Sequence, residues 1–322
     1  MAPQRFAALD LGTNTFRLLI AEPAPSGYRV VYRDRRITRA GGGFSNETGI
    51  APEAHRRILE SLRGFRQLMD DFQVGRYEAV ATSVFRCAVN RDEVLADIAR
   101  EAGLKVHVLS GTDEAEASAL GAVAEISLDG PAVIFDVGGG STEYILWSSR
   151  ATEFRASLEF GVVRLAEDIL RSDPPAAAEI QAAEELVAPQ VVALADDIHA
   201  RLAGRPFTLI GTAGTVSTLG AIDLGLRAYD RDRINGHRLP ATSVRDNFAK
   251  FKQLTKGERL AIPGIEAGRE DLIVPGCLIT LRTLDAFGCD ALTTSEGGLL
   301  EGIMGKLMGA PQAPVEVRGN SI

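Results

Sequence analysis

The 322-residue chain has few of the residues that build disulfide frameworks and zinc sites. Its three cysteines, Cys87, Cys277 and Cys289, are an odd and scattered set, which favours a reducing compartment, so we expect a cytoplasmic protein. Its four histidines lie far apart and show no zinc-ligand spacing. No apolar run reaches the ~18 residues of a membrane span, so we expect no membrane partner. The N-terminal residues also show no signal-peptide pattern.

Basic residues are outnumbered by acidic ones, 35 to 43, which gives a formal net charge of −8. This balance argues against a dedicated DNA or RNA binder, since such proteins present a basic face. It does not exclude an anionic substrate, because backbone N–H groups bind phosphate within an acidic protein. The 45% of hydrophobic residues rules out intrinsic disorder, and the length suggests two domains.

Short apolar runs alternate with helical patterns, which predicts an α/β fold. Residues 35–49 are rich in arginine and glycine and are predicted to form a mobile loop, and Pro275 is predicted to interrupt a helix over 270–287. Asp113 and Glu116 form a possible capping pair. The predicted strands cover 6–9, 16–21, 28–32, 79–82, 106–109, 132–135, 144–147, 152–158 and 207–210, and the other predicted helices 58–72, 93–102, 112–126, 176–203, 242–254 and 296–308.

The two halves of the chain open in the same way. DLGTNTFRLLI (10–20) and DVGGGSTEYIL (136–146) align without a gap, each with a strand that ends in Asp-x-Gly, a turn of small residues and a returning strand. We interpret this as a duplicated unit. A third loop of the same composition, GTAGT (211–215), follows a later strand.

Loops without bulky side chains let several backbone N–H groups converge on an anion, which suits phosphate. Three matching loops are more specific than one, although each one alone also fits a hairpin turn that needs glycine. The predicted phosphate-binding residues are Gly12, Thr13, Asn14 and Thr15, then Gly138, Gly139, Gly140, Ser141 and Thr142, and finally Gly211, Thr212, Gly214 and Thr215.

Two aspartates, Asp10 and Asp136, stand beside these turns and would repel phosphate unless a hard cation lay between them. Mg²⁺ typically takes one or two carboxylates, waters and phosphate oxygens. Glu143 lies on the returning strand and can fold back to the same place, although its spacing fits a solvated strand residue equally well. Asp136 and Glu143 are therefore the first candidate metal ligands, followed by Asp10.

Several segments resemble the exopolyphosphatase/guanosine pentaphosphate phosphohydrolase (Ppx/GppA) family, from about residue 5 to 308. They are DLGTNTFRLLI, ATSVFRCAVN (81–90), LSGTDEAEASALGAV (109–123), DVGGGSTEYIL and IGTAGTVSTLGAI (210–222), together with RAGGGFSNETGIAPEA (39–54), FGVVRLAE (160–167) and AGREDLIVPG (267–276). The resemblance implies two ribonuclease-H-like domains of the actin, Hsp70 and sugar kinase superfamily, with the active site in an interdomain cleft. We expect the domains at 1–124 plus a C-terminal helix at about 297–322, and at 125–296.

The same resemblance implies an Mg²⁺-dependent (or Mn²⁺-dependent) hydrolase that releases terminal phosphate from polyphosphate. Guanosine pentaphosphate (pppGpp) is the alternative substrate, and both present a terminal phosphoanhydride. A homodimer is a further expectation from the family. A small-molecule kinase that uses ATP and an alarmone sensor without turnover are the competing function classes.

The family's catalytic glutamate lies in a Ser-Gly-x-Glu-Glu-Ala segment, which reads SGTDEA (110–115) here and makes Glu114 the candidate general base. Without the resemblance, Glu114 would simply complement a helix dipole. Arg86 matches the family's Thr-Ser-x-x-Arg arginine, which faces phosphate, whereas a lone arginine in this position is otherwise a surface charge. Leu300 stands where the family usually has arginine, and longer members add helical domains after the core, so a short two-domain form is expected.

Overall fold

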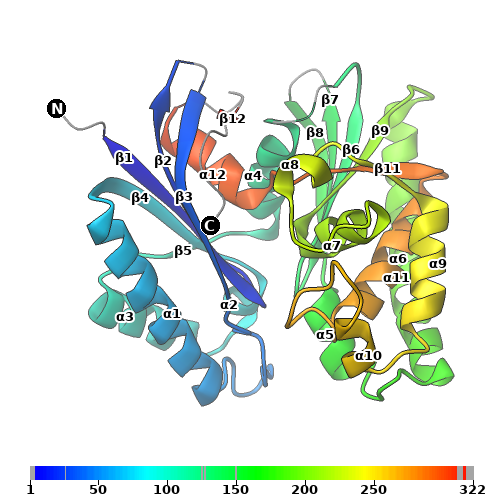
Figure 1. Ribbon diagram of the computed structural model, residues 1–322, viewed down its shortest axis with the longest axis horizontal. Coiled ribbons are helices and arrows are strands. Elements are labelled where there is room, and N and C mark those ends of the chain that lie inside the picture. Colours follow the sequence, from blue (N-terminus) through cyan, green and yellow to red (C-terminus); the bar gives the residue numbers. More distant parts are fainter. Residues whose placement is uncertain are drawn as a thin grey trace. The chain divides into compact units, whose positions relative to one another are not determined.

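The chain folds into two compact units, each built on one six-stranded mixed sheet with helices (Figure 1). The computed structural model describes residues 4–25, 27–124, 126, 128–148, 151–309 and 315–316. Unit 1 comprises Met1–Glu125 and Gly297–Ile322, and unit 2 comprises Ile126–Glu296. The predicted α/β class is confirmed. In the described part of the chain, no helix combines the length and the apolar character that crossing a membrane requires.

Unit 1 has the strand order β12-β3-β2-β1-β4-β5. Strands β1, β2 and β3 form an antiparallel meander, and β4 and β5 continue the sheet parallel to β1. The strands are β1 (Arg5–Leu11), β2 (Thr15–Ala24), β3 (Gly27–Ile37), β4 (Val74–Ala81), β5 (His107–Val108) and β12 (Val315–Glu316). The helices are α1 (Pro52–Asp71), α2 (Ser83–Cys87), α3 (Arg91–Ala102), α4 (Gly111–Ala124) and α12 (Leu299–Leu307).

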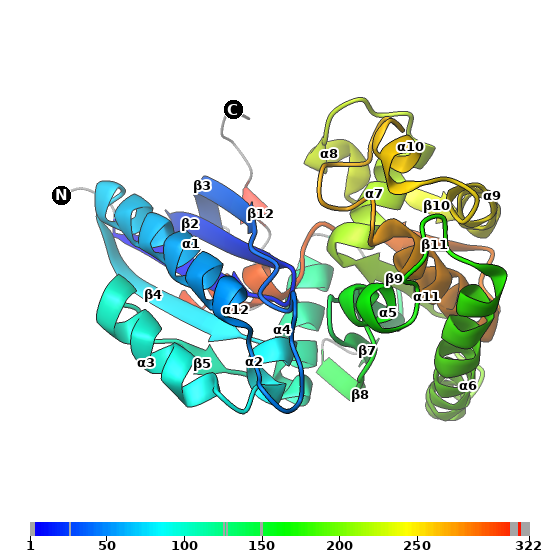
Figure 2. The same cartoon turned by 90° about the horizontal axis from the view of Figure 1, so that it is seen from below.

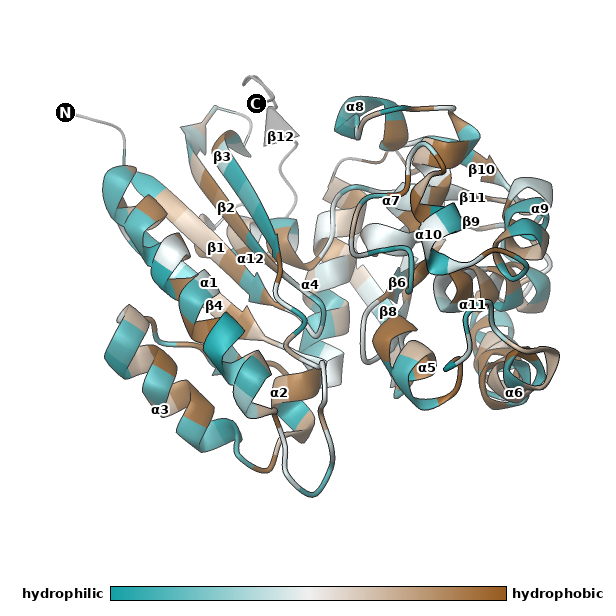
Figure 3. Ribbon diagram, turned by 60° about the horizontal axis from the view of Figure 1, so that its bottom comes forward, coloured by the Kyte–Doolittle hydropathy of each residue, from teal (hydrophilic) through white to brown (hydrophobic). Residues whose placement is uncertain are grey.

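Alternation along β1 places apolar side chains on both faces of this sheet. Leu9 and Leu11 belong to the core under α1 and α3, whereas Phe6 and Ala8 belong to the core under α4 and α12 (Figure 2). The helices bury only one face, which accounts for the alternating teal and brown residues along α1 and α3 in Figure 3. Asp10 has the same parity as Phe6 and Ala8, so it lies on the face that α4 covers.

Unit 2 has the strand order β10-β11-β9-β6-β7-β8. Its strands are β6 (Ala132–Val137), β7 (Thr142–Ser148), β8 (Ala151–Leu158), β9 (Thr208–Thr212), β10 (Arg238–Pro240) and β11 (Ala291–Thr294). Its helices are α5 (Val162–Asp168), α6 (Ala177–Leu202), α7 (Ala213–Asp223), α8 (Arg231–Ile234), α9 (Ala241–Phe251), α10 (Lys256–Leu260) and α11 (Ile273–Ala286). The main core packs one face of the sheet against α6, α9 and α11.

The two sheets repeat one topology. In unit 2, β6, β7 and β8 form the antiparallel meander, and β9 and β11 follow parallel to β6, as β4 and β5 follow β1 in unit 1. The duplicated unit inferred from the two Asp-x-Gly segments is therefore confirmed at the level of strand order and direction. A consequence is that each unit has three parallel strands whose carboxyl ends meet at one sheet edge, where α/β folds bind ligands.

Several local predictions were wrong. The strand β3 continues to Ile37, so the arginines at its end belong to the sheet and not to a mobile loop. Helix α11 begins at Ile273, which places Pro275 in the first turn, where the missing N–H group has no intrahelical partner to lose and causes no interruption. The helices α2, α5, α7, α8 and α10 and the short strands β10 and β11 were not predicted.

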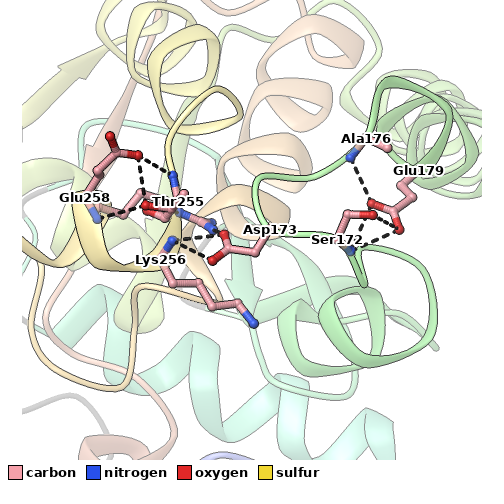
Figure 4. A network of polar contacts seen from close by, with 8 residues as sticks. Ser172, Asp173, Ala176, Glu179, Thr255, Lys256 and Glu258 are labelled. Atoms are coloured by element: carbon pink, nitrogen blue, oxygen red, sulfur yellow. Dashed lines mark hydrogen bonds and ion pairs between the residues drawn. The ribbon is translucent and has the colours of Figure 1, made fainter.

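Glutamates close two helix starts in unit 2 (Figure 4). Glu179 accepts backbone N–H groups of Ser172 and Ala176, and Glu258 accepts that of Thr255. These hydrogen bonds are the main cause that lowers the pKa of both carboxyls below the ordinary value. Nearby, Asp173 accepts from the Lys256 N–H group, which ties the segment before α6 to α10.

Candidate active site

The first predicted phosphate loop, residues 12–15, connects β1 to β2 and is closed by its own backbone. The Gly12 N–H group donates to the Thr15 carbonyl at 3.2 Å, and a side chain at Gly12 would come within 3.0 Å of that oxygen. Thr13 is 7% exposed, and its Oγ1 is buried without a hydrogen-bond partner among the described residues. A buried hydroxyl that is left unsatisfied is costly, so a ligand oxygen would be its natural partner.

Asp10, at the end of β1, faces Arg17 of β2 in the sheet register. Arg17 donates from Nε and Nη2 to Asp10 Oδ2, at 2.8 and 2.5 Å, and Asp10 is 3% exposed. The guanidinium already compensates the charge of this carboxylate, so of the three predicted metal ligands Asp10 fits a cation least well. The sequence reasoning did not consider Arg17, although it lies within the matched segment.

The two predicted catalytic residues are in direct contact. Glu114 lies in the first turn of α4, which follows β5, and Arg86 lies on α2, which follows β4. Arg86 Nη1 donates to Glu114 Oε2 at 2.8 Å and to the Leu109 carbonyl at 3.2 Å. Both side chains are largely buried, with relative exposures of 19% for Arg86 and 11% for Glu114.

The start of α4 is capped differently from the predicted pair of Asp113 and Glu116. Ser110 Oγ accepts the Asp113 N–H group at 3.1 Å and donates to the Asp113 carboxylate at 2.7 Å. This is a local capping box, which leaves Glu116 outside the cap. It fixes the first turn of the helix, and with it the backbone of Glu114.

Strand pairing brings the residues of unit 1 to one sheet edge. Leu11 pairs with Ala81, and Ala81 pairs with Val108, so β1, β4 and β5 end at the same level. The loop 12–15, Arg86 and Glu114 each follow one of these three strand ends. The structure thus places the first loop and both predicted catalytic residues at the carboxyl edge of the unit 1 sheet; we call them the unit 1 group.

The second predicted loop, residues 138–142, connects β6 to β7. Gly138 donates to the Ser141 carbonyl at 3.0 Å, and a side chain at Gly138 would come within 2.8 Å of that oxygen. The carbonyls of Gly138 and Gly139 accept N–H groups of Val162 and Val163, at 3.0 and 2.8 Å, so the first residues of α5 hold the loop in place.

The remaining predicted metal ligands, Asp136 and Glu143, face each other across β6 and β7. Directly opposed residues of an antiparallel pair project from the same face of the sheet. Glu143 is 1% exposed, and Ser157 Oγ donates to its Oε1 at 2.8 Å. This pairing excludes the alternative in which Glu143 is a solvated strand residue.

The third loop, residues 211–215, joins β9 to α7. Asp136 pairs with Thr212, so this loop lies beside the β6–β7 hairpin at the carboxyl edge of the unit 2 sheet. A side chain at Gly214 would collide with the Arg269 guanidinium, which therefore lies against the first turn of α7. We call the loops 138–142 and 211–215, with Asp136, Glu143 and Arg269, the unit 2 group.

Sequence reasoning missed Arg269 as a site residue. It occurs in the segment AGREDLIVPG, which carried the resemblance only as a whole. A cation next to the N-terminus of a helix is electrostatically unfavourable unless an anion lies between them. Its position beside Gly214 is therefore a signal for anion binding that only the fold reveals. The Arg269 side chain is held by Glu266, with Nε 3.3 Å from Oε2.

Three glycine- and threonine-rich loops and two arginine–carboxylate pairs, on a duplicated α/β scaffold, define a phosphate-handling protein. The family model of the Ppx/GppA phosphatase family matches residues 19–310, and the chain belongs to this family. It is 36% identical to exopolyphosphatase 2 of Mycobacterium tuberculosis, over 96% of this chain and 100% of that protein.

Other relatives support the same placement. A guanosine-5'-triphosphate,3'-diphosphate pyrophosphatase of Aeromonas hydrophila is 25% identical over 94% of this chain, which spans 59% of that longer protein. Among solved structures, an exopolyphosphatase from Cytophaga hutchinsonii superposes with a TM-score of 0.87 at 26% identity, covering 95% of this chain and 98% of that one. The predicted family and its two-unit fold are confirmed.

Proposed function

We propose that this chain is an exopolyphosphatase, which hydrolyses the terminal phosphoanhydride bond of inorganic polyphosphate and releases orthophosphate. The observation that carries the proposal is the contact between Glu114 and Arg86 at the sheet edge where loop 12–15 begins. It combines a carboxylate, a guanidinium and a phosphate loop, which are the parts that hydrolysis of a phosphoanhydride requires. The 36% identity to an exopolyphosphatase over almost the whole chain supports the same choice of substrate.

In this mechanism, Glu114 accepts a proton from water while the water oxygen attacks the terminal phosphorus. The bond between that phosphorus and the bridging oxygen breaks, and the shortened chain leaves with the bridging oxygen as an anion. Arg86 stabilises the charge on the transferred group through paired N–H donors, and the loop amides and Thr13 orient it. Positioning and charge stabilisation supply most of the acceleration, since the transition state asks little covalent chemistry of the protein.

A divalent cation fits the unit 2 group. Asp136 and Glu143 project from one face of the hairpin, and two adjacent carboxylates are unfavourable without a positive charge. The described residues contain no cluster of three or more His, Cys, Asp or Glu side chains suited to a metal. Two carboxylates still suit Mg²⁺ or Mn²⁺, because water and substrate oxygens complete the coordination. When bound, the cation would neutralise phosphate charge, and Asp136 and Glu143 would hold it.

Guanosine pentaphosphate is the second candidate substrate, because the Aeromonas hydrophila relative acts on guanosine 5'-triphosphate 3'-diphosphate by its name. Phosphate release should be measured with Mg²⁺ on short polyphosphate, long polyphosphate, guanosine pentaphosphate and ATP. Cleavage of polyphosphate supports the proposal, and faster cleavage of guanosine pentaphosphate supports the alternative. Phosphotransfer from ATP would identify a kinase, and binding of the alarmone without release would identify a sensor.

The role of Glu114 is tested with Glu114→Gln and a matched control, Glu116→Gln, on the same helix. Removing a general base lowers kcat by about 10²- to 10⁴-fold. Glu114→Gln should retain polyphosphate binding and lose turnover, whereas Glu116→Gln should keep both, because Glu116 contacts Lys306 at 4.0 Å on α12. Near-normal turnover in Glu114→Gln would remove this residue from the mechanism.

A further inference from the structure

Arg39 has a backbone conformation that favours glycine, with φ at 49°. The described residues include four non-glycine residues with positive φ: Arg39, Gln73, Ala203 and Ala213. Gln73 and Ala203 follow the ends of α1 and α6, where left-handed residues are common. Ala213 directly follows β9 in the third phosphate loop. Arg39 is not at a helix end, and strain of this kind is found preferentially at functional sites.

Hydrogen bonds hold the main chain of Arg39 against the first phosphate loop. The Arg39 N–H group donates to the Asn14 carbonyl at 2.8 Å, and Gly41 donates to the Thr13 carbonyl at 2.8 Å. The Arg39 carbonyl accepts from Gly42 N–H and from Arg57 Nη2, at 3.0 and 2.8 Å. These bonds stabilise a strained residue at the border of loop 12–15.

The side chain of Arg39 is exposed, whereas its neighbours Thr38 and Ala40 are buried at 2% and 0%. The loop to which it is bound contains the buried, unpartnered hydroxyl of Thr13. A guanidinium beside an unsatisfied hydroxyl and a turn of backbone amides matches the chemistry of a polyanion, because arginine binds phosphate with two parallel hydrogen bonds.

From this geometry we infer that Arg39 binds the polyphosphate chain next to its terminal group, as a residue that sets affinity for the chain. The inference rests on the proposed function and adds to it a contact outside the loop amides. Terminal phosphate occupies the loop, and the exposed guanidinium beside the loop holds the phosphoryl groups that follow. Arg39 therefore contributes to substrate binding more than to the chemical step.

The backbone provides a direct test, because glycine adopts this φ without strain. Arg39→Gly removes the guanidinium and relaxes the backbone, so the melting temperature should not fall. Loss of a charge-assisted contact should raise KM for long polyphosphate by about 10- to 100-fold, and this rise should exceed any fall in kcat. Arg39→Lys, which keeps one positive charge, should lie between the variant and the natural protein.

Gln73→Gly is the matched control, because Gln73 is an exposed residue with a φ of 54° at the end of α1. It relieves the same kind of strain and should leave KM and kcat unchanged. In the Glu114→Gln background, which binds without turnover, adding Arg39→Gly should weaken the affinity for long polyphosphate by the same factor as the rise in KM. That affinity should also become less sensitive to salt.

The outcomes separate the inference from the proposed function. If the natural protein cleaves polyphosphate and Arg39→Gly shows the same KM and the same affinity at low salt, the inference is wrong. A lowered melting temperature with unchanged KM would also refute it, since Arg39 would then be structural. If the natural protein does not cleave polyphosphate, the proposed function fails first, independently of Arg39.

Discussion

Helix α12 packs backbone to backbone against α4, the helix that carries Glu114, and this contact allows a sharp test of positioning (Figure 1). A Cβ atom at Gly302 would lie 2.7 Å from the carbonyl carbon of Ala117 and closer still to its oxygen. Ala117 follows Glu114 by three residues, in the adjacent turn of α4. Replacing Gly302 with alanine therefore pushes directly on the part of α4 that positions the proposed base.

The start of α12 is fixed more firmly than α4 is. Glu301 accepts the Gly298 N–H group at 3.0 Å and Arg33 Nη1 at 2.6 Å, and it is 4% exposed. Real Cβ atoms essentially never come within 3.0 Å of another heavy atom. The two helices must therefore separate by roughly 1 Å, with most of the movement in α4.

Gly302→Ala should lower kcat by about 10- to 100-fold, because a displacement of ~1 Å at a reacting group can cost that much. The unfolding free energy should fall by ~1–3 kcal/mol, as expected for an overpacked contact. KM should change less, since the loops at 12–15, 138–142 and 211–215 are not displaced. Steady-state phosphate release and urea unfolding monitored by circular dichroism measure both effects.

Gly257→Ala is the matched control, because Gly257 lies in helix α10 and a Cβ atom there would meet nothing within 4 Å. It should keep kcat and raise stability by about 0.5–1 kcal/mol, as alanine is the better helix former. If Gly302→Ala remains folded with normal kcat, the α4–α12 contact does not position Glu114, and the reasoning is refuted.

Three further predictions follow from other parts of the structure. The lowered pKa of Glu179 and of Glu258 means that both glutamates stabilise the fold above their unfolded pKa, and that this contribution disappears as the pH falls through their folded pKa; Glu179→Gln should therefore weaken the pH dependence of urea unfolding between neutral and acidic pH. Iodoacetamide should label exposed Cys87 in the native protein, whereas Cys277, whose burial raises its pKa, should react only after unfolding; mass spectrometry of labelled peptides decides this. Glu143→Gln should raise the Mg²⁺ concentration needed for half-maximal phosphate release by about 10- to 100-fold, and an unchanged Mg²⁺ requirement would remove Glu143 from the proposed metal site.

The sequence was informative where function depends on local geometry. Strand β1, the turn after Asp10 and strand β2 are adjacent in the chain, so composition and hydrophobic pattern predict them together. The same holds for the hairpin of Asp136 and Glu143, where seven residues separate two partners that a short turn brings opposite each other. Local signals of this kind predicted the loops and the candidate carboxylates.

Contacts between distant segments could not be predicted in this way. Arg269 reaches Gly214 only because β9, α7 and the segment before α11 pack together in unit 2. The strained conformation of Arg39 has no sequence signature, because arginine rarely adopts it and the three glycines that follow suggest that they provide the turn. The end of β3 was missed because its arginines disguise an edge strand as a polar loop.

The two repeats use one geometry for two different charges. Asp10 faces Arg17 and Asp136 faces Glu143, and both members of the second pair lie 126 residues after their counterparts (136 − 10 and 143 − 17). Unit 1 thus places a fixed cation opposite its aspartate, whereas unit 2 places a second carboxylate there. An arginine supplies positive charge permanently, while two carboxylates gain by binding a mobile divalent cation. The duplicated scaffold therefore accounts for our assignment of the metal to unit 2 and not to Asp10: the position that would complete a metal site in unit 1 is occupied by the Arg17 guanidinium.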